Sequence, residues 1–248
     1  MKYKIFGIIC GLLITVSSCS KNKDEATDNN ESLFVEGFWA IKDGAEFSYL
    51  ALLPNDTFLY AENDLSVNSN KENGLELGTY IYDAKKEEIK FNIEYDDNDP
   101  GNDSGVGDIG SLLSYKASLL EESTKLSLLN GELVFDKIEL TASSPVVGVW
   151  SAKYGSEFSY LALLPNNTFL YAEYVSLVRS DRENGLEVGT YVYDSNKEEI
   201  VFDIEYDDND PGNNSGVGDI GTPAKLSVQL SNNNNTLTIA GLVLAMSL

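Results

Sequence analysis

The sequence predicts an all-β protein made of two tandem antiparallel up-and-down β-barrels, each of about eight short strands. Three observations support this prediction: a long internal repeat, hydrophobic alternation with a period of two, and turn-forming residues at short intervals. The first indicates two copies of one unit, and the other two indicate that each unit is built from strands.

The repeat divides the chain into two domains. The stretch Phe47–Glu62 (FSYLALLPNDTFLYAE) recurs as Phe158–Glu173 (FSYLALLPNNTFLYAE), a separation of 111 residues (158 − 47). Each unit is as long as an ordinary domain, unlike the short units of a solenoid, which cannot bury a face alone. We therefore expect one β domain at residues 35–140 and a second at 146–248.

Within a unit, residues alternate between two faces. In the clearest example, one predicted face carries Ile89, Phe91, Ile93 and Tyr95, and polar residues fill the positions between them. The sequence Pro54-Asn55-Asp56 between two β-rich runs is typical of a tight hairpin turn. Eight strands are expected in the first unit, near Gly37, Phe47, Thr57, Leu75, Ile89, Tyr115, Leu126 and Leu133. Closing such strands into a barrel removes the exposed sheet edges.

The N-terminus has the pattern of an export signal. Lys2 and Lys4 precede an apolar stretch, Ile5–Val16, which is about a dozen residues long and so shorter than the roughly 20 that cross a bilayer. This stretch is followed by Val16-Ser17-Ser18-Cys19. Residues 1–18 are therefore predicted to be a removable signal peptide rather than a membrane-spanning helix.

The sequence around Cys19 resembles the lipobox of bacterial lipoproteins. The resemblance implies that Cys19 receives a diacylglyceryl group and becomes the new N-terminus, anchored by several acyl chains. Ser20, in place of Asp, resembles the outer-membrane sorting choice, and residues 20–25 (SKNKDE) resemble a surface-export signal of Bacteroidota lipoproteins. We expect residues 19–34 to be the lipidated cysteine and a disordered tether, at the periplasmic or extracellular face of the outer membrane.

A second resemblance concerns the repeated unit. It combines Gly37-Phe38-Trp39, the hairpin sequence LLPNDTFLYAE, Gly78-Thr79-Tyr80 and an Ile-x-Phe strand. This combination is similar to the small lipocalin-like domains of Bacteroidota lipoproteins, and it implies the same barrel architecture for each repeat.

Composition excludes several classes of function. The chain has no histidine, which excludes His-based zinc sites and Ser-His-Asp or Cys-His catalysis. Its two cysteines, Cys10 and Cys19, lie within and at the end of the export segment, so the mature chain has no disulfide or CxxC motif. The net charge of −23 makes nucleic acid an unfavourable partner.

One long acidic loop in each repeat is a candidate calcium site. Tyr95–Asp108 and its copy Tyr206–Asp219 are rich in Asp, Asn and Gly, and calcium prefers six to eight oxygen ligands on a flexible backbone. The candidate ligands are Asp97, Asp99, Asp103, Asp108, Asp208, Asp210, Asn214 and Asp219. The alternative is an acidic surface loop of turn-forming residues without a metal.

Aromatic residues and paired carboxylates suggest further sites. Trp39 and Trp150 could line a pocket or fill the barrels, with filling favoured. Four tyrosines could form a carbohydrate-stacking platform or pack between strands, with packing favoured: Tyr80, Tyr82, Tyr191 and Tyr193. Glu76 and Glu94 could form a glycosidase pair, although spacing along strands does not fix the separation that such a pair requires.

These observations predict a non-enzymatic, membrane-anchored binding or interaction module with no certain cofactor, possible Ca²⁺-stabilised acidic loops and a protein or glycan as partner. One alternative is a lipocalin-type carrier of a small apolar ligand, which requires a cavity inside each barrel. A second alternative is a hydrolase that uses carboxylates alone.

Overall fold

The computed structural model describes residues 35–43, 46–63, 74–96, 105–141, 144–154, 157–174, 185–207 and 216–248. The predicted signal peptide, Cys19 and the tether lie outside these residues. Among the described residues, no helix has the length and apolarity needed to cross a membrane.

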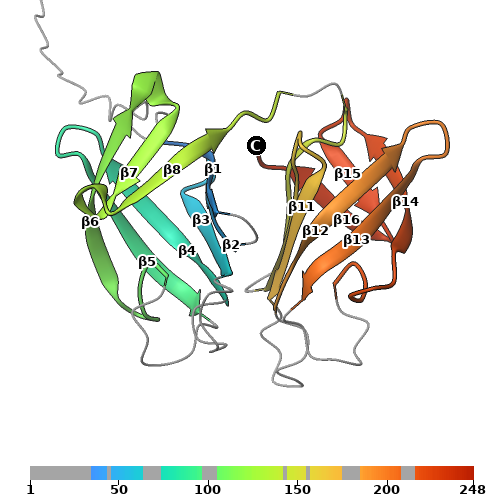
Figure 1. Ribbon diagram of the computed structural model, residues 1–248, viewed down its shortest axis with the longest axis horizontal. Helices are drawn as coiled ribbons and strands as arrows, with labels where there is room; N and C mark the ends of the chain where they lie inside the picture. Colours follow the sequence, from blue (N-terminus) through green and yellow to red (C-terminus); the bar gives the residue numbers. More distant parts are fainter. Residues whose placement is uncertain are drawn as a thin grey trace, which may run out of the picture.

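The described chain forms two closed antiparallel barrels of eight strands each, which confirms the predicted fold class (Figure 1). Barrel 1 consists of β1 (Gly37–Asp43), β2 (Glu46–Leu52), β3 (Thr57–Asn63), β4 (Gly74–Asp83), β5 (Glu88–Asp96), β6 (Leu112–Leu120), β7 (Lys125–Leu128) and β8 (Leu133–Ile138). Barrel 2 consists of β9 (Gly148–Tyr154), β10 (Glu157–Leu163), β11 (Thr168–Tyr174), β12 (Gly185–Asp194), β13 (Glu199–Asp207), β14 (Ala224–Ser231), β15 (Thr236–Ile239) and β16 (Leu242–Met246). Two 3₁₀ turns flank β7: η1 (Glu121–Ser123) and η2 (Leu129–Gly131).

The predicted hairpin turn joins β2 to β3. The Asn55 side chain accepts hydrogen bonds from the backbone N–H and the hydroxyl of Thr57, at 3.3 and 2.6 Å. Asp56 follows with φ of 60°, the left-handed conformation that Asp and Asn tolerate better than most residues. Asn166 and Asn167 repeat this arrangement in barrel 2, so the same local chemistry sets the register of both hairpins.

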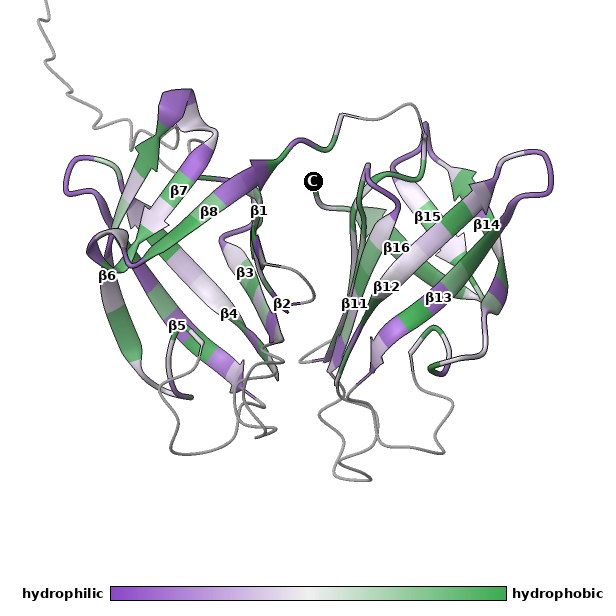
Figure 2. Ribbon diagram, viewed as in Figure 1, coloured by the Kyte–Doolittle hydropathy of each residue, from purple (hydrophilic) through white to green (hydrophobic). Residues whose placement is uncertain are grey.

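Side chains fill the interior of each barrel. Trp39 and Trp150 are fully buried, and their indole N–H groups donate to the carbonyls of Val35 and Val146, at 2.9 and 2.8 Å. Other large buried side chains in the two interiors are Phe58, Tyr80, Phe91 and Phe135 in barrel 1 and Phe169, Tyr191 and Phe202 in barrel 2. The tryptophans therefore belong to the barrel cores, as favoured above. Figure 2 shows that many of the polar residues lie at the turns.

A third hydrophobic core joins the two barrels. The outward faces of β1–β4 and β9–β12 are apolar and pack against each other. They contribute Phe38, Ala40, Phe47, Tyr49, Ala51, Leu53, Leu59, Ala61, Leu75 and Leu77 from barrel 1 and Val149, Tyr160, Ala162, Leu164, Leu170, Ala172, Leu186 and Val188 from barrel 2. We call this the inter-barrel core. The repeat did not predict it, and it makes the two domains one packed unit.

The inter-barrel core has approximate two-fold symmetry. The hydroxyl of Tyr49 in barrel 1 lies near Thr168 of barrel 2, and the hydroxyl of Tyr160 lies near Thr57 in the equivalent way. Burial at this interface raises the pKa of both tyrosines. Because equivalent residues of the two repeats exchange equivalent contacts, the interface has the self-complementary character of a symmetric dimer within one chain.

Strand order places the connections at two poles of each barrel. In an up-and-down barrel successive strands run in opposite directions, so β1, β3 and β5 end at the same pole, which we call the loop pole. The acidic segments 97–104 and 208–215 leave β5 and β13 at the loop poles. The chain enters each barrel at the opposite pole, the entry pole, and Figure 1 shows the two loop poles facing the same way.

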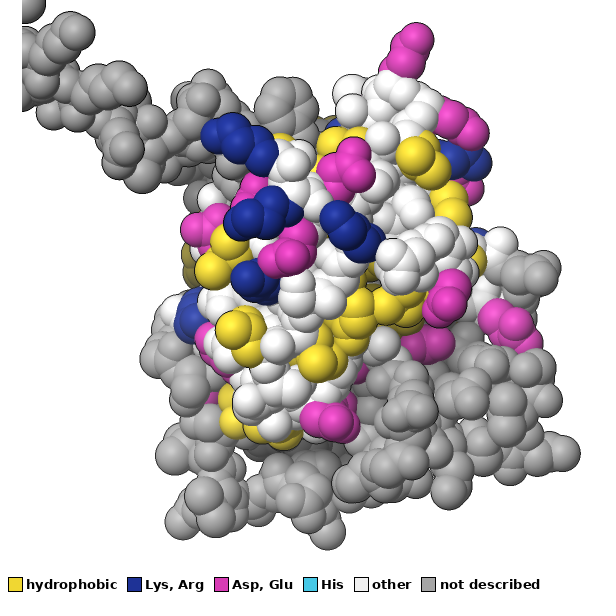
Figure 3. Space-filling model, turned by 90° about the vertical axis from the view of Figure 1, so that its left-hand side faces the viewer, with side chains coloured by type: hydrophobic (Ala, Val, Ile, Leu, Met, Phe, Trp, Pro, Cys, Tyr) yellow, Lys and Arg dark blue, Asp and Glu magenta, His cyan; other side chains and the backbone are white. Residues whose placement is uncertain are grey.

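The outer face of barrel 1, away from barrel 2, carries mixed charge. Figure 3 shows lysines, acidic residues and apolar residues interspersed on this face. Lys90 pairs with Glu88 at 3.0 Å, and Lys125 pairs with Asp136 at 3.0 Å. The lysines therefore form no uniformly basic patch among the described residues of this face.

Candidate functional site

Most of the candidate calcium ligands lie outside the described residues: Asp97, Asp99, Asp103, Asp208, Asp210 and Asn214. The other two, Asp108 and Asp219, are exposed, and their carbonyls accept the N–H groups of Ser111 and Thr222, at 3.0 and 3.2 Å. Within the part of the chain that the structure describes, no three metal-ligating side chains come together.

A buried carboxylate holds the end of each acidic loop at the loop pole. Glu76 of β4 is 0% exposed, and both of its carboxylate oxygens accept the N–H of Val106, at 3.0 and 2.9 Å. Tyr115 donates its hydroxyl to the Val106 carbonyl at 2.8 Å. In barrel 2, Glu187 is likewise 0% exposed and accepts the N–H of Val217 at 2.9 Å.

The sequence suggested Glu76 only as half of a glycosidase pair, and it did not single out Glu187; it predicted a buried anchoring role for neither. Burying an ionised group is costly unless hydrogen bonds compensate it, so each Glu fixes the backbone that satisfies it. A signal was present in the sequence, because Gly74-Leu75-Glu76-Leu77-Gly78 places one acid inside an apolar strand.

Glu76 does not pair with Glu94 in the way that a glycosidase pair requires. Glu76 points into barrel 1, where its strand neighbour Tyr60 is part of the core. Glu94 is exposed on the outside of the barrel and faces barrel 2. Because the sheet separates the two carboxylates, they cannot act on one bond.

A β-bulge turns Tyr95 to the opposite face from the one predicted. Leu77 pairs with Tyr95 but Gly78 pairs with Ile93, which leaves Glu94 as an extra residue in β5. Tyr95 therefore joins Glu94 on the outside and packs against the inter-barrel core, whereas strict alternation would have placed it inside with Ile93.

Glycine permits this bulge. A Cβ atom at Gly78 would lie 2.0 Å from the carbonyl oxygen of Asn92. At that distance the strands β4 and β5 could not remain paired. Barrel 2 repeats the device: the register shifts between Val188 and Gly189, and a Cβ at Gly189 would lie 2.0 Å from the Asp203 carbonyl oxygen. The bulge thus turns one tyrosine outward in each repeat, Tyr95 in barrel 1 and Tyr206 in barrel 2.

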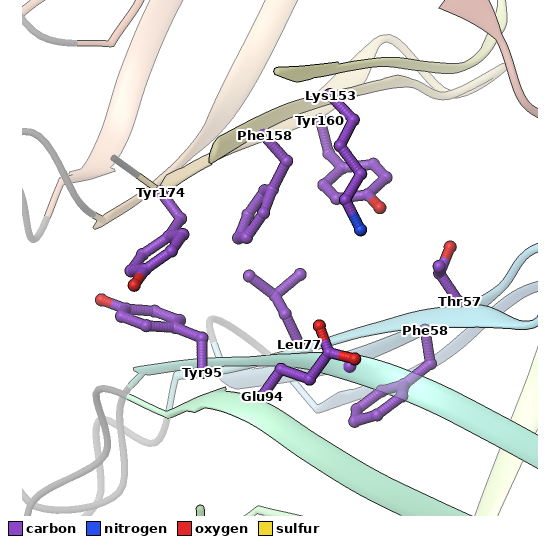
Figure 4. Close-up of a pocket in the computed structure, with 10 residues that line it drawn as sticks. Thr57, Phe58, Leu77, Glu94, Tyr95, Lys153, Phe158, Tyr160 and Tyr174 are labelled. Carbon is purple, nitrogen blue, oxygen red and sulfur yellow. The ribbon is translucent and has the colours of Figure 1, made fainter. Parts of the chain in front are cut away.

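A cavity of about 130 Å³ lies between the barrels, beside the inter-barrel core. Barrel 1 contributes Thr57, Phe58, Leu77, Gly78, Glu94 and Tyr95, and barrel 2 contributes Lys153, Phe158, Tyr160 and Tyr174. Figure 4 shows the Lys153 ammonium and the Glu94 carboxylate pointing into this space from opposite walls. We call it the inter-barrel cavity.

Aromatic rings form one side of the inter-barrel cavity. The rings of Tyr95 and Tyr174 are 4.5 Å apart across the interface, and Phe158 stacks on Tyr174 at 5.3 Å. On the other side, the hydroxyls of Tyr160 and Thr57 line the cavity from the two barrels. The cavity therefore combines an apolar wall with a small number of convergent polar groups, a composition typical of ligand sites.

The approximate symmetry places equivalent residues on the other side of the inter-barrel core. Lys42, Phe47, Tyr49, Glu205 and Tyr206 correspond to Lys153, Phe158, Tyr160, Glu94 and Tyr95. Phe47 and Tyr206 contact each other across the interface at 6.3 Å, edge to face. The sequence differs at one wall, where Asn63 corresponds to Tyr174, so these residues provide a natural control for the cavity.

The tyrosines considered as a carbohydrate platform have packing roles. The hydroxyls of Tyr80 and Tyr191 donate to the carbonyls of Leu53 and Leu164, at 3.1 and 3.0 Å, inside the barrels. Tyr82 and Tyr193 are partly buried against the same cores. The four rings therefore form no exposed stacking surface, and the favoured interpretation is confirmed.

No protein-family model, curated protein or solved structure matches this chain.

Proposed function

We propose that this protein is a lipid-anchored, non-enzymatic binding module that presents the loop poles of two packed barrels away from the membrane. The observation that carries the proposal is topological. The chain enters barrel 1 at Gly37, at the pole opposite the one where the acidic segment 97–104 leaves β5. An anchor at Cys19 therefore connects to the entry pole and leaves the loop pole the more exposed to partners.

The filled barrel interiors support a binding module over the carrier of an apolar ligand. A lipocalin-type carrier needs an open cavity of about 300 Å³ or more inside the barrel. In the described parts of the chain, that position is occupied by the buried side chains around Trp39 and Trp150.

The packing of the barrels also supports presentation of paired loops. Because the inter-barrel core fixes the two barrels against each other, their loop poles form one composite surface. A protein or glycan partner that contacts both loop poles gains affinity from their fixed spacing. The second contact does not have to position one barrel against the other, so its entropic cost is smaller. Calcium bound by the acidic segments would stiffen this surface.

The anchor is tested in cells. We expect Cys19→Ala to move the protein from the membrane fraction to the soluble fraction, and an inhibitor of the lipoprotein signal peptidase to cause the precursor to accumulate. Ser20→Ala is the matched control and should leave membrane association unchanged. A Cys19→Ala protein that stays in the membrane fraction would refute the anchor.

The loop pole is tested separately with the chain from Ser20 to Leu248. Millimolar Ca²⁺ should raise its melting temperature relative to EDTA, because a metal that binds only the folded state stabilises it. Replacing Asp97 and Asp99 with Asn should reduce the shift, as should the equivalent changes at Asp208 and Asp210. An unchanged melting temperature in calcium would remove the metal from the proposal without affecting the anchor.

A further inference from the structure

We propose that the inter-barrel cavity binds a small zwitterion of the amino-acid class, with its carboxylate at Lys153 and its ammonium at Glu94. The proposal does not depend on the lipid anchor or on calcium, because the cavity lies between the barrel walls and contains none of the acidic-loop candidates.

The opposed charges define the polarity of the ligand. Lys153 and Glu94 enter the cavity from different barrels, and neither belongs to an ion pair among the described residues. A simple anion would be attracted to Lys153 but repelled by Glu94 and by the overall charge of −23. A simple cation would be repelled by Lys153, whereas a neutral molecule with both charges satisfies the two walls together.

The apolar wall and the volume define the size of the ligand. A cavity of about 130 Å³ is close to the roughly 150 Å³ that holds benzene in an engineered core, so the occupant has on the order of six to ten non-hydrogen atoms. The rings of Tyr95, Phe158 and Tyr174 offer an apolar surface for a side chain, and their faces also attract an ammonium group. Small aliphatic amino acids meet these requirements.

The geometry of the site is built rather than incidental. Glu94 points outward by ordinary alternation, and the bulge opposite Gly78 turns Tyr95 outward beside it, so that both line the cavity. At the edge of the cavity, Tyr160 of barrel 2 lies next to Thr57 of barrel 1, so residues of both barrels enclose the same space. A ligand that spans Glu94 and Lys153 would therefore bridge the barrels directly.

The test uses the chain from Ser20 to Leu248 and four probes, measured by calorimetry and by melting temperature. L-leucine carries both charges, N-acetyl-L-leucine lacks the ammonium, L-leucinamide lacks the carboxylate, and D-glucose is uncharged. We expect leucine to bind, and each blocked derivative to bind about tenfold more weakly or less, since each loses one charged hydrogen bond. Glucose should show no binding.

Variants assign each charge to its partner. Lys153→Met should weaken leucine about tenfold and remove most of its advantage over leucinamide, while Glu94→Gln should remove its advantage over N-acetyl-leucine. The matched controls are Lys42→Met and Glu205→Gln at the symmetry-related positions, which should keep the wild-type affinity. Because all four side chains are exposed, unchanged melting temperatures should show that the fold is retained.

Three results would overturn the proposal. One is the absence of any calorimetric or thermal response to leucine up to about 10 mM, a concentration at which even millimolar binding shifts the melting temperature. Another is tighter binding of glucose or of a charge-blocked derivative than of leucine. The third is an equal loss of leucine affinity in the Lys42 and Glu205 variants.

Discussion

The bulge between β4 and β5 gives the sharpest prediction, because one added methyl group should disrupt it. In Gly78→Ala the new Cβ would lie 2.0 Å from the Asn92 carbonyl oxygen and 3.0 Å from a ring carbon of Phe58. Side-chain carbons essentially never come within 3.0 Å of such atoms, so the strands must part by about 1 Å or more. Because β4 and β5 lie in a closed barrel, neighbouring strands resist this movement.

The expected cost follows from what the shift breaks. Overpacking of a tightly fitted site costs about 1–3 kcal/mol, and two weakened ladder hydrogen bonds add about 1 kcal/mol each. We therefore expect Gly78→Ala to lower the free energy of unfolding by about 3–5 kcal/mol, a large part of the roughly 5–15 kcal/mol of a typical domain. Gly189→Ala, 2.0 Å from the Asp203 carbonyl oxygen, should cost a similar amount in barrel 2.

The assay is urea unfolding of the chain from Ser20 to Leu248, monitored by circular dichroism. Gly110→Ala is the matched control: its φ is +76° but nothing lies within 4 Å of the added Cβ, so only the backbone strain of about 1–2 kcal/mol applies. If Gly78→Ala is no less stable than Gly110→Ala, the close approach of the two strands is not what requires glycine, and the account of the bulge fails.

Three further predictions concern the interface, the buried carboxylates and alkaline pH. Ala51→Arg should place an unpaired charge in the inter-barrel core at a cost of several kcal/mol and separate the barrels, which raises the radius of gyration in X-ray scattering. The control Ile81→Arg lies on an uncovered face and should leave the radius of gyration unchanged. Equal radii of gyration in the two variants would contradict the packing of the barrels. Glu76→Ala should remove about 2–3 kcal/mol of hydrogen bonding and speed amide exchange at Val106, and undiminished protection there would contradict the anchoring role. Burial raises the pKa of Tyr191 to about 12, so the unfolded chain loses this proton first. The contribution of Tyr191 to the free energy of unfolding should be complete below pH about 10, fall between pH about 10 and about 12 and be lost above pH about 12. Tyr191→Phe should flatten this decline in urea unfolding across that range, and an equally steep decline in the variant would contradict the assignment.

The sequence predicted the barrels because each of their determinants is local. Alternation in Ile89-Lys90-Phe91 assigns an inner and an outer face, Asn55 sets a hairpin, and the repeat extends both assignments to the second half. The candidate sites were less predictable. Asp108 and Asp219 were named as candidate calcium ligands because their loops are rich in Asp, Asn and Gly. Loop composition does not state which oxygens converge, and in the structure the backbone carbonyls of these two residues accept hydrogen bonds within turns.

The inter-barrel core had a signal that alternation obscures. The run Phe47-Ser48-Tyr49-Leu50-Ala51-Leu52-Leu53 is apolar at almost every position, which is typical of a strand buried on both faces. A single barrel with one solvated face needs only every second residue. The second apolar face therefore required a partner, and the sequence alone did not show that the partner was the other repeat.

The amino-acid sequence by itself determined the strand positions and the duplication, because these follow from short-range patterns of burial and turn chemistry, whereas it left the filling of the barrels open. Only the tertiary structure decided which surfaces meet. The bulge reverses the direction of Tyr95, the sheet separates Glu76 from Glu94, and the packing of two repeats brings Glu94 opposite Lys153. These outcomes depend on contacts between residues far apart in the chain, and local patterns do not state which residues meet.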